Sequence, residues 1–448
     1  MTQDPRELID RSAMSKWQIS VITLCILLVS LDGFDVLSIS FAAPGIAKEW
    51  GIDRAGLGIV LSMELIGMGF GAFILGHLAD RIGRRPTILM SLLMMAVGMY
   101  LASIADSVVL LSIVRLFTGL GIGGILASVN AMAAEYSNAR SRNLSVSLMA
   151  AGYPLGVIIG GSVATLLLAN FDWRSVFLFG AIATLIFLPV TWLLMPESIA
   201  HLMHKRPTDA LQRINRTLRR MGHASLEVLP PEPEQPLHTH IARLFKADMI
   251  RSTVLLAIAY FAHIMTFYYI IKWIPKLVVD MGYSPALSGT VLVWANVGGI
   301  LGAVLLGLLT RRYCVNNLVI GSLLLAAIMV AVFGTGQSTL LELSLIAGIA
   351  GFFTNAAIVG MYALFAQSFP TEVRAGGTGF VIGIGRGGAV MGPVLAGFLL
   401  QSSQGGLFMV SVIMAAGSLI AAAALVFMPR QKTEASSLTE VSRGLDGA

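Results

Sequence analysis

Two aspartates lie three residues apart inside the apolar segment 17–43, in the sequence LDGFD. Asp32 and Asp35 share one face of a helix, because residues three apart are neighbours on a helical surface. A carboxylate near the middle of a membrane span costs about 2.5–3.5 kcal/mol on insertion scales, and such groups normally mark an ion or substrate pathway. We therefore expect one of the two aspartates to carry a proton, and the alternative is a helix kink at Gly33 capped by their side chains.

Three other charged side chains also interrupt apolar segments. The position of Glu64 inside a predicted span indicates either a second proton site or an ion-pair partner for a neighbouring span, and both interpretations stay open. Arg386 lies in the sequence GIGRGG, where its guanidinium could bind a carboxylate in bidentate geometry or pair with Asp32 or Asp35. Lys272 either attracts a carboxylate or extends its ammonium toward the membrane surface.

The composition predicts an integral membrane protein with an all-α fold. Hydrophobic residues make up 56% of the 448 residues and charged residues only 12%, against about 25% charged residues in a soluble domain. The apolar residues form twelve blocks long enough to span a bilayer. The predicted spans are 17–43, 56–78, 86–106, 109–132, 144–168, 174–195, 251–275, 286–309, 317–336, 340–366, 376–401 and 405–428.

The basic residues are concentrated in alternate loops. Arg81 and Arg84 follow the second span, Arg140 follows the fourth, and nine Lys or Arg residues lie between Lys205 and Arg251. By the positive-inside rule, both termini and this central segment are cytoplasmic. We expect the protein to lie in the inner membrane. This distribution explains the net charge of +6 without a nucleic-acid partner.

Similar motifs recur in the two halves of the chain, which predicts a duplicated fold. Arg140 and Arg374 follow corresponding spans, and so do Gly76 and Gly307. A transport path then lies between two six-helix bundles. The segment 206–220 predicts a basic amphipathic helix on the inner membrane surface. The expected organisation is a tail at 1–16, a bundle at 17–197, a linker at 198–250, a second bundle at 251–428 and a tail at 429–448.

The sequence GHLADRIGRR at 76–85, which we call the gating loop, resembles the G-x-L-a-D-r-x-G-R-k/r motif of the major facilitator superfamily. The resemblance extends over essentially the whole chain, and it implies two bundles of six helices with pseudo-two-fold symmetry. It also implies that the loop latches the cytoplasmic gate. We expect Asp80 to accept hydrogen bonds from amides at a helix N-terminus. The implied gating residues are Gly76, Asp80, Arg81, Gly83, Arg84, Glu135 and Arg140.

Within the superfamily, the chain is similar to the aromatic acid:proton symporters. The similarity lies in LDGFD, APGIAKEWGIDRAGLG at 43–58, AAEYSNARSR at 133–142 and GIGRGGAVMGP at 383–393. It implies import of a benzoate-like or hydroxybenzoate-like acid with protons, by alternating access. It also implies a role in proton coupling for Arg115, which lies within the fourth span. The substrate contacts expected beside Arg386 and Lys272 are Tyr268, Trp294 and Asn296.

Other functions are less consistent with these patterns. The sequence shows no set of nucleophile and base, no metal-ligand spacing and no nucleotide loop, so we expect neither an enzyme nor a bound cofactor or metal. Two alternatives stay open: proton-driven efflux of a small hydrophobic compound, and a transporter-like sensor of aromatic acids. The expected partners are an aromatic carboxylate, protons and the lipid bilayer, with the protein acting as a monomer.

Overall fold

The chain folds into long helices, seen in a computed structural model that describes residues 4–230, 241–246, 249–310, 312–370, 373–402 and 406–428. Within these residues there is no strand, and twelve helices are long and apolar enough to cross a membrane. The predicted all-α membrane fold is therefore confirmed, while the predicted tail 429–448 lies outside the described residues. The spans are α2 (Lys16–Trp50), α3 (Arg54–Ile82), α4 (Arg84–Ser103), α5 (Val108–Glu135), α6 (Arg142–Asn170), α7 (Arg174–Leu194), α10 (Ile250–Asp280), α11 (Pro285–Leu309), α12 (Val315–Phe333), α13 (Leu340–Ser368), α14 (Arg374–Ser402) and α15 (Gly406–Val426).

Polar capping residues fix where several of these helices begin. Ser15 and Gln18 form a capping box at the start of α2, in which each side chain bonds to the backbone amide of the other residue. Asp53 caps α3 by accepting a hydrogen bond from the amide of Gly56 at 2.7 Å. The helices therefore extend beyond the apolar blocks of the sequence, so that α2 is 35 residues long.

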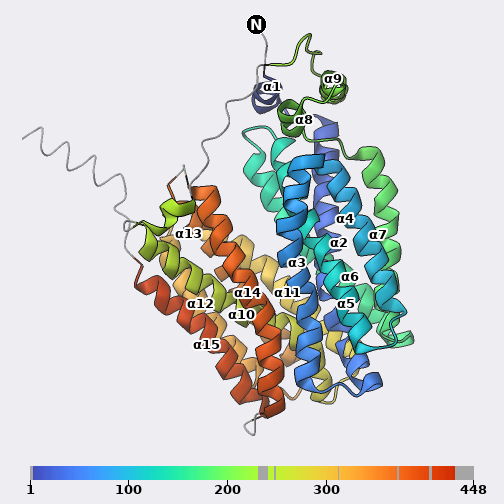
Figure 1. Ribbon diagram of the computed structural model, residues 1–448. Helices are drawn as coiled ribbons and strands as arrows, with labels where there is room; N and C mark the ends of the chain where they lie inside the picture. The colour runs from blue at the N-terminus through green and yellow to red at the C-terminus, as the bar shows by residue number, and fades with distance from the viewer. Residues whose placement is uncertain are drawn as a thin grey trace, which may run out of the picture.

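The spans form two bundles, α2–α7 and α10–α15, which lie side by side in Figure 1. Corresponding helices pack together in each half: α3 contacts α5 as α11 contacts α13, and α2 contacts α6 as α10 contacts α14. This matching is the pseudo-two-fold symmetry expected of a duplicated fold. The short helices α1 (Pro5–Arg11), α8 (Ile199–Lys205) and α9 (Ala210–Met221) gather at one end of the first bundle, which we call the α8 end.

The two bundles contact each other mainly toward the opposite end, which we call the far end. Ser62 of α3 donates a hydrogen bond to the carbonyl of Val390 in α14 at 2.9 Å. Closer to the far end, Arg54 donates to the carbonyl of Leu400 at 3.0 Å and pairs with Asp280 at 3.2 Å. The bundles diverge toward the α8 end in Figure 1. The structure is thus the state in which the far end is closed.

The basic helix predicted at 206–220 is present as α9, but its predicted position on the membrane surface is wrong. Ile214, Leu218 and Met221 form its apolar face and are buried, because α9 packs on α8 and on α2. The guanidinium of Arg220 lies 5.9 Å from the ring centre of Trp17, at the start of α2. The amphipathic pattern therefore reflects packing on the first bundle.

Candidate functional site

Four charged side chains from four helices meet between the ends of the spans. We call Asp35, Glu64, Arg115 and Lys272 the buried ion network, and the side chains of all four are at most 2% exposed. Arg115 of α5 donates to a carboxylate oxygen of Asp35 at 2.9 Å and to the backbone carbonyl of the same residue at 2.8 Å. Its second terminal nitrogen also donates to Glu64 of α3. One arginine thus holds α2, α3 and α5 together.

Lys272 connects this network to the second bundle. Its ammonium lies 3.5 Å from the carboxylate of Glu64 and donates to the backbone carbonyl of Val36 in α2. The Lys272 side chain is fully buried, so the expectation that it extends to the membrane surface is wrong. Glu64 has the ion-pair partners that were one of its two expected roles. Since Glu64 accepts from a cation of each bundle, the network crosses the bundle interface.

Asp32 is buried close to this network but is not part of it. Its residue is 1% exposed, and in the described part of the chain neither carboxylate oxygen has a hydrogen-bond partner. Gly33 allows the approach of α6, because a Cβ atom there would collide with the backbone of Tyr153. The hydroxyl of Tyr153 also has no partner among the described residues. Two polar groups on packed helices of the first bundle are thus left without hydrogen bonds.

Arg386 of the second bundle acts electrostatically on Asp32, Tyr153 and Tyr268. The α14 glycines on either side of Arg386 face α10, where Gly385 lies against Tyr260. Arg386 itself is partly exposed and, within the described residues, its guanidinium forms no hydrogen bond or ion pair. A cation without a partner thus lies within range of a carboxylate without a partner.

The predicted substrate contacts are not all brought together. Tyr268 is buried and lies within electrostatic range of Arg386. The side-chain amide of Asn296 donates to the carbonyl of Leu292 in its own helix at 2.9 Å. Trp294 is 49% exposed, and in the described part of the chain it forms no hydrogen bond or ring contact. Contacts of substrate with Asn296 and Trp294 stay predictions.

Three tyrosines near Arg386 were missed by the sequence reasoning. Tyr153 lies beside Asp32, and the hydroxyls of Tyr260 and Tyr362 are 3.0 Å apart within range of Arg386. Tyr153 follows a glycine in the sequence AGYPLG, but this pattern is equally typical of helix packing. Only the packing of α6 on α2 shows that this tyrosine faces the charged residues.

The gating loop comprises the end of α3, Gly83 and the start of α4, and its geometry depends on a residue outside it. Glu197 accepts hydrogen bonds from the backbone amides of Arg84 at 2.7 Å and Ser198 at 2.9 Å. Gly83 has φ +110°, and a Cβ atom there would also collide with the carboxylate of Glu197. In this state Asp80 pairs with the side chain of Arg84 at 2.7 Å and does not cap α4, so its expected hydrogen bonds from helix N-terminal amides stay a prediction.

The remaining predicted gating residues differ in their surroundings. Glu135 accepts a hydrogen bond from the hydroxyl of Ser198 at 2.6 Å, and not from Arg140. Arg81 and Arg140 are exposed, and Gly76 has open space around its Cα atom. In this state the described contacts of the loop stay within the first bundle. A gating role for these residues stays a prediction.

Comparison with known proteins identifies the family. A sequence profile described as Major Facilitator Superfamily matches residues 25–347 and 256–444. The chain is 33% identical over 407 residues to the 4-hydroxybenzoate transporter PcaK of Acinetobacter baylyi, with 89% of each chain covered. It is 30% identical over 407 residues to the gallate transporter of Pseudomonas putida, with 90% of each chain covered. The chain belongs to the major facilitator superfamily.

A solved structure of this superfamily has the same fold. The partially occluded inward-open conformation of the xylose transporter XylE from E. coli matches 94% of this chain and 100% of that chain, with a TM-score of 0.73 and 18% identity. Membership in the superfamily makes the chain a multi-pass membrane protein and not an enzyme. Its resemblance to transporters of aromatic acids is also confirmed.

Proposed function

We propose that this protein imports an aromatic carboxylate together with protons, by alternating access between its two bundles. The observation that carries the proposal is the position of Arg386, a partly exposed cation without a partner within range of Asp32. The names of the relatives support the substrate class, because they transport 4-hydroxybenzoate and gallate. The substrate position then lies between the bundles, as in other transporters of this type.

Arg386 has the chemistry to bind the carboxylate of the substrate. A guanidinium binds a carboxylate through two parallel hydrogen bonds, and its planar fork fits this geometry better than an ammonium does. Tyr268 and Tyr260 lie within range of Arg386 and present aromatic surfaces for the ring of the acid. We assign these three residues to the substrate site. Lys272 is assigned to the ion network, because Glu64 and the Val36 carbonyl already occupy its ammonium.

Asp32 is the residue we assign to proton binding. A buried carboxylate without hydrogen bonds is costly in its charged form. When a substrate carboxylate binds Arg386, a second negative charge arrives close to Asp32, and repulsion between the two is removed if Asp32 takes up a proton. Substrate and proton therefore favour each other's binding. Asp35 is the second candidate for proton binding, because Arg115 is already its ion-pair partner.

The structure is then the state that releases substrate. The far end is closed by contacts between the bundles, and the basic gating loop lies at the α8 end. By the positive-inside rule we assign the α8 end and both termini to the cytoplasm of a cell with an inner membrane. The gating loop would form contacts with the second bundle only after the bundles rock to open the far end.

Uptake into proteoliposomes tests this proposal. Labelled benzoate, 4-hydroxybenzoate, protocatechuate, gallate and gentisate are offered with an imposed pH gradient, acid outside. We expect accumulation of at least one acid, its collapse with a protonophore, and its loss in Asp32→Asn and Arg386→Ala. Lys205→Gln removes an exposed cation at the α8 end and serves as a matched control. Folded wild-type protein that accumulates none of these acids would overturn the proposal.

A further inference from the structure

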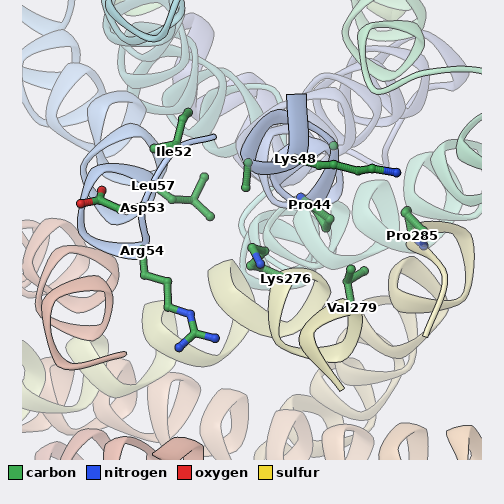
Figure 2. Close-up of a pocket in the computed structure, with 11 residues that line it drawn as sticks. Pro44, Lys48, Ile52, Asp53, Arg54, Leu57, Lys276, Val279 and Pro285 are labelled. Carbon is green, nitrogen blue, oxygen red and sulfur yellow. The ribbon is translucent and has the colours of Figure 1, made fainter. Parts of the chain in front are cut away.

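A cavity lies between the bundles at the far end, and none of the residues that line it belongs to the ion network. It has a volume of about 480 Å³ and is formed by the end of α2, the start of α3, the end of α10 and the start of α11 (Figure 2). In this structure the bundles are in contact here, through Arg54 and Asp280. The cavity is therefore an open depression on the closed end of the molecule.

Three of the four charged side chains in the lining of this cavity are positive. Lys48, Arg54 and Lys276 line it, and Figure 2 shows Lys276 between the other two. Lys48 is exposed and, within the described part of the chain, has no hydrogen bond or ion pair. Asp53, the one carboxylate in the lining, accepts the hydrogen bond that caps α3. The N-termini of α3 and α11 meet here, and each helix dipole adds positive potential.

The rest of the lining is apolar. Pro44, Leu57, Val279 and Pro285 contribute carbon surface between the cationic groups. A ring with one carboxylate presents the complementary chemistry, since its ring can contact these side chains while its charge lies near the cations. A small inorganic anion would use only the charges. The lining is thus complementary to both the ring and the charge of an aromatic carboxylate, and only to the charge of an inorganic anion.

We propose that this cavity is a second carboxylate site, in which an aromatic acid is held before the far end opens. The inference rests on the proposed function, because it takes its substrate class from there. It also gives the site a consequence for the gate. Asp280 pairs with Arg54 across the bundle interface and with Lys276 in its own helix. A carboxylate bound in the cavity competes with Asp280 for these cations and weakens the contact that closes the far end.

Binding of labelled 4-hydroxybenzoate to detergent-purified full-length protein tests the site apart from transport. We expect two classes of binding in wild type, of which Arg386→Ala removes one and Lys48→Gln weakens the other. Since an exposed ion pair is worth about 0.2–1 kcal/mol, this substitution should weaken binding by about 1.4- to five-fold. The weakening should disappear at about 1 M salt, where charges are screened within about 3 Å. Lys205→Gln removes the same charge at the α8 end and should leave both classes unchanged.

Three results would overturn the inference. The first is a single class of binding in wild type. The second is that Lys48→Gln does not weaken the binding that remains in Arg386→Ala, and the third is that inorganic phosphate competes for this remaining binding as well as benzoate does. The same experiments distinguish failure of this inference from failure of the proposed function. If Lys48→Gln weakens binding but the wild-type protein shows no uptake, the transport proposal fails and the second site stands. If uptake is normal but Lys48→Gln leaves binding unchanged, the second site fails and the transport proposal stands.

Discussion

The ion pair between Glu64 and Lys272 connects the two bundles, and its removal should have a measurable cost. Glu64→Gln removes the carboxylate that accepts from Arg115 and Lys272. Arg115 then keeps Asp35 as a partner, while Lys272 keeps the Val36 carbonyl and no carboxylate. Breaking a buried ion pair by removing one partner costs about 3–5 kcal/mol, because a charge is left buried without compensation. We expect the free energy of unfolding to fall by about this amount.

The double variant separates the pair from its surroundings. Lys272→Met alone leaves Glu64 with Arg115, while Glu64→Gln together with Lys272→Met removes one charge of each sign. The double variant should therefore be more stable than Glu64→Gln, with an interaction energy of about 0.5–3 kcal/mol between the two sites. The double-mutant cycle is measured by unfolding wild type, the two single variants and the double variant in the same detergent, with fluorescence recorded against denaturant or temperature.

The same variants report on the gate. Lys272 holds α10 against α2 and α3 in the closed half of the molecule. In Lys272→Met, a cysteine introduced between the ion network and the α8 end should therefore react faster with a membrane-impermeant thiol reagent that is added at the far end. Additive effects of the two substitutions, with no change in reaction rate, would refute the view that this pair joins the bundles.

Three other predictions concern separate parts of the molecule. Gly33→Val places side-chain atoms against the backbone of Tyr153 and should lower the free energy of unfolding by about 1–3 kcal/mol, measured by thermal unfolding. Glu197→Ala leaves amides at the start of α4 without an acceptor and should cost about 1–3 kcal/mol, whereas equal stability would show that water replaces the carboxylate. Burial lowers the pKa of His201 from 6.5, so its neutral form favours the folded state and this contribution is lost as the pH falls below about 6.5. The difference in thermal unfolding midpoint between wild type and His201→Asn should therefore change below that pH and stay constant above it.

Much of the fold could be predicted from the sequence because membrane spans follow directly from composition. A run of about twenty apolar residues must form a helix whose backbone groups are satisfied internally. The ends were less accessible: the apolar block 17–43 marks the membrane core, while α2 continues from Lys16 to Trp50 because Ser15 caps its start and Gly51 ends it. The amphipathic pattern of α9 was misread, since a surface of the first bundle and a lipid surface bury the same apolar face.

The site could be predicted only in part. A charge inside an apolar span is visible in the sequence, which is how Asp32, Asp35 and Arg386 were found. Which charges pair depends on contacts between helices that are far apart in the chain, so that the roles of Glu64 and Lys272 could not be chosen. The pairing across the bundles also depends on the conformational state, which a sequence does not specify.

Movement of protons on addition of substrate is the measurement that tests proton-coupled import most directly. Proteoliposomes with a pH-sensitive dye inside and no initial gradient receive benzoate or 4-hydroxybenzoate from outside, and protein-free liposomes correct for diffusion of the neutral acid. We predict substrate-dependent acidification of the interior that Asp32→Asn abolishes and Lys205→Gln retains. Uptake of the labelled acid by wild type without any protein-dependent pH change would contradict the account, and so would unchanged proton movement in Asp32→Asn.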